Sequence, residues 1–160
     1  MSRSADSPGS REIGFEMPER YNAGRILYDN LAAGRADKTA IRCAGRAISY
    51  RELCRLANRV GSGLAAMGLE RSERVLLLLD DTPAYPAAVF GAIRAGFVPV
   101  LVNTLSPADD VTYFVRDSGA RIVFAEAALT AKLADAGPGL ERVVVVDGEP
   151  AGGLPAPCIR

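Results

Sequence analysis

The strongest constraint on the fold of this chain is an alternation of short apolar segments with stretches of helical periodicity in its second half. The first apolar segment, Val75–Leu79, is a continuous run, which is typical of a strand covered on both faces. Later strands are expected at 98–102, 121–124 and 142–146, and the helices between them at 84–95, 107–118 and 127–136. This alternation predicts right-handed βαβ units, so we expect an α/β protein with a mostly parallel sheet.

The first half of the chain predicts a helix and a β-hairpin ahead of that sheet. The helix is expected at 23–33, with Asn22 as its N-cap and Gly34 in the left-handed conformation after its end. Two short strands at 39–43 and 46–49 are separated by only two residues, one of which is glycine. That spacing predicts a short antiparallel hairpin.

A second helix is expected at 50–67, directly after the hairpin. Ser49 and Glu52 form the capping-box pattern, in which each side chain accepts a hydrogen bond from a free backbone N–H group of the other residue. Glu70 and Glu73 follow among several arginines, and this mixture of charges predicts a solvated face.

The length of 160 residues fits one domain of ordinary size or one piece of a larger domain. Residues 1–12 are rich in Ser, Arg and Gly and are expected to be disordered. Residues 13–147 are expected to form the α/β unit. Residues 148–160 contain several Gly and Pro residues, which predicts a linker or a loose tail.

Composition excludes several classes of function. The 19 basic residues balance the 19 acidic residues, so the chain as a whole lacks the basic surface that nucleic-acid binding needs. Histidine is absent, which removes Ser-His-Asp catalysis, Cys-His catalysis and His-ligated zinc. No segment has the length of a membrane span or the pattern of a signal peptide. The three cysteines are widely spaced, which favours reduced thiols and a cytoplasmic location.

Three short motifs have both a functional and a structural interpretation. Gly61-Ser62-Gly63 suggests a dinucleotide fingerprint, but the next glycine is misplaced and the motif ends a helix, so close helix packing is favoured. Asp80-Asp81 follows a strand and could bind Mg²⁺ or a polar ligand at the sheet edge, although aspartates are also common in solvated turns. Cys54 could be a reactive thiol, but the chain offers no partner base, so a small apolar role is favoured.

Arg94 is the strongest candidate for a ligand-binding residue. It lies in the last turn of the helix expected at 84–95, where a cation stabilises the helix dipole. That structural role would explain the residue by itself. A phosphate-binding role is the functional alternative, because the guanidinium group donates paired hydrogen bonds to phosphate oxygens.

Several stretches together resemble one family. Ile48–Leu53 resembles the Thr-Tyr-x-Glu-Leu helix start of adenylate-forming acyl- and aryl-CoA ligases, and Phe90–Val100 resembles their helix and strand ending in Gly-x-x-Pro. The remaining matching stretches are Pro18–Asn22, Glu73–Val75, Asn103–Leu105, Tyr113 and Asp117–Arg121. The resemblance covers about residues 13–147 and is strongest to the benzoate–CoA ligase branch.

The resemblance implies the first subdomain of a larger enzyme. Such ligases use ATP and Mg²⁺ to convert a carboxylic acid to an acyl-adenylate, and coenzyme A (CoA) then displaces AMP. Their phosphate loop, adenylate motif, ribose-binding Asp, hinge and catalytic Lys match no position here. The resemblance therefore implies no catalytic residue, no metal ligand and no cofactor bound by this segment alone.

The same resemblance implies the partners and one site. The remainder of a ligase chain is the expected partner, with a small carboxylic acid as the substrate of the complete enzyme, and the uncovered apolar surface is expected to favour self-association. In these enzymes the helix that carries Arg94 lies near the CoA channel, so Arg94 is implied in binding the CoA phosphates. The alternatives are a non-catalytic remnant or interaction module, and a small flavodoxin-like nucleotide binder.

Overall fold

The computed structural model describes residues 18–152, 154 and 156–159. The segment expected to be disordered, 1–12, lies outside these residues, as do residues 13–17 of the expected α/β unit. The elements, in chain order, are α1 (Arg25–Ala32), β1 (Thr39–Cys43), β2 (Arg46–Ser49), α2 (Tyr50–Ala66), β3 (Arg74–Leu78), α3 (Ala84–Ala95), β4 (Val98–Leu101), α4 (Ala108–Ser118), β5 (Ile122–Glu126), the 3₁₀ helix η1 (Ala127–Leu133), β6 (Arg142–Val146) and β7 (Cys158–Ile159).

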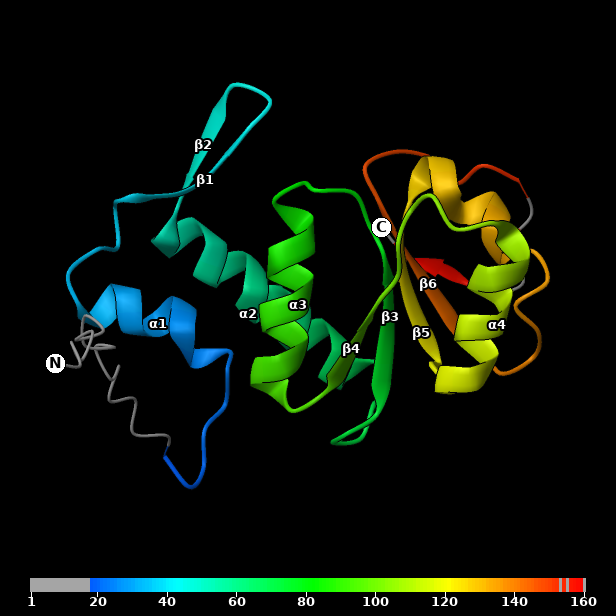
Figure 1. Ribbon diagram of the computed structural model, residues 1–160, viewed down its shortest axis with the longest axis horizontal. Coiled ribbons are helices and arrows are strands. Elements are labelled where there is room, and N and C mark those ends of the chain that lie inside the picture. Colours follow the sequence, from blue (N-terminus) through cyan, green and yellow to red (C-terminus); the bar gives the residue numbers. More distant parts are fainter. Residues whose placement is uncertain (1–17, 153, 155, 160) are drawn as a thin grey trace, which may run out of the picture.

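Five parallel strands form the main sheet in the order β4-β3-β5-β6-β7, and β1 and β2 form a separate antiparallel hairpin. In register, Leu76 of β3 lies between Val100 of β4 and Val123 of β5. The hairpin projects away from the sheet at the end of the molecule that holds α1 (Figure 1). The predicted α/β class, the parallel sheet and the preceding hairpin are therefore confirmed.

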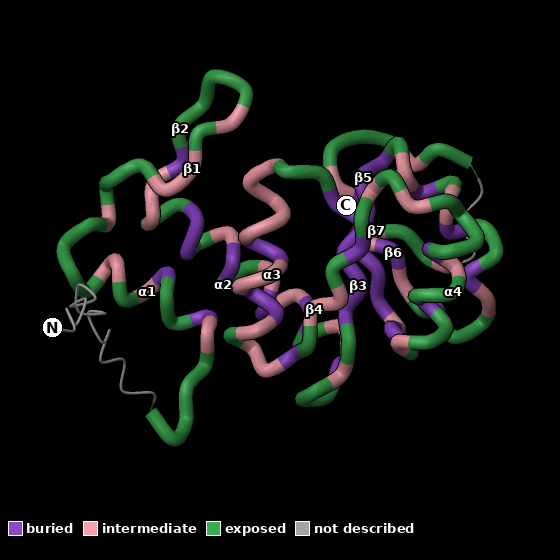
Figure 2. Tube along the Cα trace, in the orientation of Figure 1, coloured by how far each residue is buried: buried purple, intermediate pink, exposed green. Residues whose placement is uncertain are grey.

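Helices cover both faces of the sheet. Helices α2 and α3 lie on one side and α4 on the other (Figure 1). Leu76 and Leu78 belong to the core under α4 and η1, whereas Val75 and Leu77 belong to the core under α2 and α3. This alternation explains why the whole run is apolar, and Figure 2 shows the buried residues concentrated in these strands.

Helix α2 begins at the predicted capping box. The backbone N–H of Glu52 donates to Ser49 Oγ at 3.2 Å, and the backbone N–H of Ser49 donates to Glu52 Oε2 at 2.8 Å. With 17 residues α2 is the longest helix described. Across the described part of the chain, no helix is both long and apolar enough to span a bilayer.

Two predicted helix starts are wrong by one or two residues. Asn22 does not cap α1; its Oδ1 accepts a hydrogen bond from the backbone N–H of Gly24, which is the residue at the N-cap. The helix expected from residue 107, with Ser106 as the N-cap that its hydroxyl and the following Pro107 favour, begins instead at Ala108, because the extended backbone continues through Pro107 (ψ 159°). In both cases the favoured capping residue forms the turn before the helix instead.

The C-terminal part differs more from the expectation. The helix expected at 127–136 is the shorter 3₁₀ helix η1. The segment expected to be a linker or loose tail contributes β7, which pairs with β6 through Val143 and Cys158. Leu154 packs against the core on the α4 side, so burial of apolar side chains orders a segment whose composition is typical of a loop.

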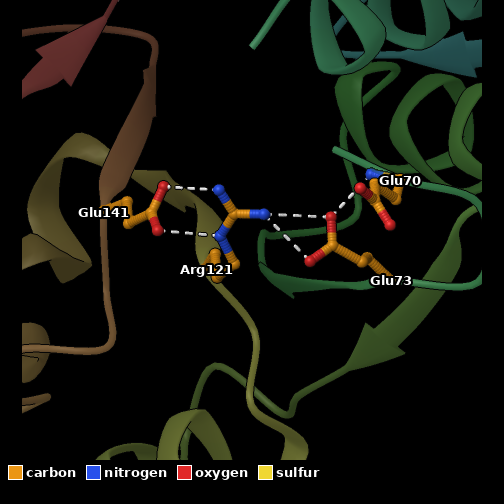
Figure 3. A network of polar contacts seen from close by, with 4 residues as sticks. All are labelled: Glu70, Glu73, Arg121 and Glu141. Atoms are coloured by element: carbon orange, nitrogen blue, oxygen red, sulfur yellow. Dashed lines mark hydrogen bonds and ion pairs between the residues drawn. The ribbon is translucent and has the colours of Figure 1, made fainter. Parts of the chain in front are cut away.

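A charged network joins the amino ends of three strands (Figure 3). Arg121, just before β5, donates from Nη1 to Glu73 Oε1 at 2.9 Å and from Nε to Glu141 Oε1 at 2.8 Å. The backbone N–H of Glu70 donates to Glu73 Oε2 at 2.6 Å. The N–H of Glu70 and then Arg121 lower the pKa of Glu73, and Arg121 lowers the pKa of Glu141. The charges expected to be simply solvated are thus partly paired across the sheet.

Candidate functional site

Arg94 lies where the sequence places it, in the last turn of α3. Gly96 ends that helix in the left-handed conformation (φ +93°), so the backbone turns directly into β4. The guanidinium is exposed and stabilises the helix dipole from this position. Within the described part of the chain, Arg94 forms no ion pair.

A tyrosine from α1 supports Arg94. The Arg94 Cζ atom lies over the Tyr28 ring, 3.7 Å from the ring centroid. The Tyr28 hydroxyl donates a hydrogen bond to Asn58 Oδ1 of α2 at 2.6 Å. Partial burial raises the pKa of Tyr28, against the opposing effect of the Arg94 charge, so the phenol stays protonated and a donor at neutral pH. Side chains from three helices therefore meet at Arg94.

The turn before α1 is fastened to the end of α3. Asn22 Nδ2 donates to the carbonyl oxygen of Ile93 at 2.8 Å. Gly24 is buried against α3, and a Cβ atom added to it would lie 2.8 Å from Arg94 Cβ. Glycine at this position lets the α1 turn approach the helix end that carries Arg94.

A shallow cavity of about 280 Å³ lies beside Arg94, between α2 and α3. Its polar lining comes from Asn58, Ser62 and Arg94, and the other lining residues are small: Ala57, Gly61, Ala65, Gly91 and Ala95. The Arg94 guanidinium, which has no carboxylate partner among the described residues, and the neighbouring Ser62 hydroxyl and Asn58 amide provide hydrogen-bond donors for an anionic group.

Gly61 is part of a close helix crossing, as the packing interpretation predicts. A Cβ atom on Gly61 would lie 3.0 Å from the carbonyl oxygen of Gly91 on α3. Gly63 has no atom within 4 Å of its own added Cβ. The Gly61-Ser62-Gly63 motif lies inside α2, not in a loop between a strand and a helix, and it does not form a dinucleotide site.

Asp80 and Asp81 lie at the carboxyl edge of the sheet, as predicted. They border a cavity of about 260 Å³ that Asn103 and Thr104 close from the β4 side. Both aspartates are exposed. Over the described ranges, no group of three or more His, Cys, Asp or Glu side chains could hold a metal ion.

Sequence reasoning missed Glu126 at the same edge. It ends β5, is only 8% exposed, and its Oε1 atom has no hydrogen-bond partner among the described residues. Burial raises the pKa of Glu126, and the nearby charges of Asp147 and Asp80 raise it further, while a hydrogen bond from the Asp80 backbone opposes the shift. A carboxylate that directly follows four apolar strand residues was the signal in the sequence.

The strand order bears on the nucleotide-binding alternative. Counted from β3, the order β4-β3-β5-β6-β7 is that of flavodoxin-like sheets, which bind ligands where the crossover direction reverses. Here that point lies between the carboxyl ends of β3 and β5, which carry Asp80, Asp81 and Glu126. Several carboxylates at this edge disfavour a nucleotide phosphate.

Cys54 is buried in the cluster that joins α1, α2 and the hairpin. Burial raises the pKa of its thiol, although the Arg94 charge opposes the shift. A buried thiol with a raised pKa is a poor nucleophile, so the structure supports the small apolar role.

An apolar groove of about 310 Å³ opens on the α2 side of the sheet. Its floor comes from Phe124 of β5, Val144 and Val146 of β6 and Ile159 of β7, and Leu64 of α2 forms one wall. Val144, Val146 and Ile159 are only partly buried. Parallel sheets are normally covered on both faces, so this part of the sheet has the composition of an interface.

Comparison with known proteins identifies the family. The pattern of the AMP-binding enzyme family matches residues 28–155. The chain is 41% identical over 140 residues to the 4-hydroxybenzoate–CoA/benzoate–CoA ligase of Rhodopseudomonas palustris, which covers 84% of this chain and 26% of the relative. It is 37% identical over 139 residues to the benzoate–CoA ligase of Thauera aromatica, and this match also covers 84% of this chain and 26% of the relative.

A solved structure agrees with these relatives. The benzoate–CoA ligase of Burkholderia xenovorans LB400 superimposes with a TM-score of 0.74 at 36% identity, over 80% of this chain and 26% of that one. The chain thus spans about a quarter of the length of the relatives that it matches. It resembles the N-terminal part of these adenylate-forming enzymes, and it belongs to the AMP-binding enzyme family.

Proposed function

We propose that this chain is the N-terminal segment of an ATP-dependent aryl-CoA ligase. The observation that carries the proposal is the 41% identity to a 4-hydroxybenzoate–CoA/benzoate–CoA ligase across most of the chain. In the complete enzyme, a carboxylate would attack the α-phosphate of ATP and release pyrophosphate. The CoA thiol would then attack the acyl-adenylate and displace AMP. An aromatic acid is the proposed substrate, ATP and Mg²⁺ are the proposed cofactors, and the free thiols favour the cytoplasm.

We propose that the chain alone does not catalyse this reaction. Adenylate formation needs oriented donors on the phosphates and a lysine near the developing charge. The sequence holds two lysines, Lys38 and Lys132. Lys132 Nζ donates to the carbonyl oxygens of Thr104 and Ser106 at 2.7 and 2.8 Å, so it is engaged in holding the loop before α4.

The residues present fit CoA better than ATP or Mg²⁺. The carboxyl edge of the sheet is acidic, but no three of the described acidic side chains lie together so that they could hold a metal ion. No step through Mg²⁺ is therefore assigned to this chain. Arg94, by contrast, carries an exposed guanidinium without a carboxylate partner in the described part of the chain, beside a cavity with polar lining. We therefore propose that Arg94 contacts the phosphates of CoA in the complete enzyme.

The proposed partner of the apolar groove is the remainder of the ligase chain. Val144, Val146 and Ile159 remain partly exposed on a face that parallel sheets normally bury. About three quarters of each relative has no counterpart here, which is ample chain to cover this face. When that chain is absent, the same surface would favour association between copies.

Pyrophosphate exchange tests the proposal. The pure chain, incubated with benzoate, ATP and labelled pyrophosphate, should show no exchange above the rate without enzyme. Residues 18–147 placed in the R. palustris ligase in exchange for its matching segment should support benzoyl-CoA formation, with the unaltered ligase as the control. Exchange by the pure chain, or a folded chimera without activity, would contradict the proposal.

A further inference from the structure

We infer that Tyr28 is a positioning residue for Arg94. The Tyr28 ring holds the Arg94 guanidinium beside the cavity, where it can bind the CoA phosphates. The inference rests on the proposed role of Arg94 in CoA binding. Its structural basis is the contact between Arg94 Cζ and the Tyr28 ring at 3.7 Å from the ring centroid.

Stacking suits an arginine that must also bind an anion. A guanidinium group is planar, and its N–H donors point outward in that plane. An aromatic ring attracts the cation through its face and uses none of those donors. A carboxylate partner would occupy them, and Arg94 has no such partner in the described residues. The Tyr28 contact thus fixes the side chain and leaves most of its N–H donors available for a ligand.

Tyr28 is itself held in place from two directions. Its hydroxyl donates to Asn58 Oδ1 at 2.6 Å, which ties the ring to α2. The turn before α1 is tied to α3 by the hydrogen bond from Asn22 to the Ile93 carbonyl oxygen. Asn58 and Arg94 both line the cavity of about 280 Å³. The Tyr28 ring therefore forms a platform for the flexible Arg94 side chain, and this platform is already in place before a ligand binds. Ordering the side chain in advance lowers the entropic cost of binding.

A purely structural role for Tyr28 makes a different prediction. Tyr28 also packs against the cluster around Leu27 and Leu53, so removing the ring should lower the melting temperature in either case. Only the positioning role predicts that the affinity for CoA falls as well, and that this loss disappears once Arg94 is replaced.

A double-mutant titration separates these roles. The dissociation constant of CoA is measured by isothermal titration calorimetry on the chimeric ligase that carries residues 18–147 of this chain, because the proposed CoA contact belongs to the complete enzyme. Relative to wild type, we expect Arg94→Gln to weaken binding about tenfold or more, which is the effect of losing a charge-assisted hydrogen bond. Tyr28→Leu should weaken it about two- to fivefold, as expected for an exposed cation–π contact, and Tyr28→Phe should retain most of the affinity.

The same titration identifies which idea fails. In the Arg94→Gln background, Tyr28→Leu should cause no further loss, and the control Arg59→Gln on the exposed face of α2 should bind as wild type does. If Arg94→Gln weakens binding but folded Tyr28→Leu does not, the positioning role is overturned and the role of Arg94 stands. If wild-type CoA binding is absent or unaffected by Arg94→Gln, the role of Arg94 fails and the inference fails with it. If Tyr28→Leu does not fold, Asn58→Ala gives a second test, compared in the wild-type and Tyr28→Phe backgrounds because Asn58 also lines the cavity. An equal loss of affinity in both backgrounds would contradict a role of the Tyr28 hydroxyl bond in holding the ring.

Discussion

Gly91 of α3 lies so close to Ala57 of α2 that a Cβ atom added to Gly91 would be 2.5 Å from the Ala57 carbonyl oxygen. The same added Cβ atom would lie 2.9 Å from Cβ of Val60. Helices α2 and α3 can therefore cross at this distance only because position 91 carries no side chain. The crossing also sets the cavity beside Arg94, since Ala57 and Gly91 both line it.

Gly91→Ala should accordingly destabilise the fold by about 1–3 kcal/mol, because the helices must separate to admit the methyl group. Gly63→Ala is the matched control on α2. Its added Cβ meets no atom within 4 Å, and alanine favours a helix over glycine, so this variant should gain about 0.5–1 kcal/mol. Urea unfolding measures both free energies, and equal effects at the two positions would refute the close crossing.

Glu126→Gln should raise the melting temperature at pH 7. The pKa of Glu126 is raised in the folded state, mainly by burial, so its ionised form opposes folding at neutral pH. As the pH falls through that raised pKa, the wild type gains a proton and stability, and the gain is complete below the unfolded pKa of about 4.3. The difference between wild type and variant should therefore shrink toward pH 4.

Thermal melts between pH 4 and pH 8 give this comparison. The control is Glu70→Gln, which makes the same substitution at an exposed position. A Glu126→Gln variant that is less stable than wild type at pH 7 would show that the carboxylate is a favourable group in the folded chain.

The isolated chain should self-associate at micromolar concentration. The apolar groove on the α2 side of the sheet and the exposed Leu101 of the edge strand β4 both lack a covering element in the described residues. Sedimentation velocity should show dimers or larger species. Val144→Glu, which places a charge on the groove floor, should shift the distribution toward the monomer, and Leu105→Glu on the exposed loop is the control. A wild-type chain that sediments as a stable monomer would contradict this expectation.

Arg94→Ala should change one half-reaction of the chimeric ligase and leave the other intact. The loss of a charge-assisted hydrogen bond to phosphate should raise the KM for CoA roughly tenfold or more. Benzoate-dependent pyrophosphate exchange, which does not need CoA, should keep its rate. If both half-reactions are unchanged and only the melting temperature falls, Arg94 acts solely on the dipole of α3.

The strands and most helix ends were predictable because local rules decide them. The apolar run at Val75–Leu79 required two covered faces, and the Ser49–Glu52 capping box marked the start of α2. The strand β7 was not predictable, because its Gly- and Pro-rich approach is typical of a loop. Only pairing with β6 and the packing of Leu154, both long-range effects, order that segment.

The candidate site was predictable in part. Arg94 could be singled out from its place at a helix end beside a family motif. Its stacking on Tyr28 could not be foreseen, because 66 positions separate the two residues. They meet only because α1 packs on α2 and the turn before α1 contacts the end of α3. The raised pKa of Glu126 could not be predicted for a similar reason. It depends on burial and on the charges of Asp80, after β3, and Asp147, after β6, which are distant in the sequence.

The central claim is that this chain is the N-terminal part of an AMP-forming aryl-CoA ligase. The most direct test is the nucleotide sequence that follows the codon for Arg160 in its gene. The claim predicts that the reading frame continues for the length of a ligase and encodes a Gly-rich loop that bears a lysine, followed later by a second, catalytic lysine. A natural stop codon directly after Arg160 would contradict the claim and favour a non-catalytic remnant.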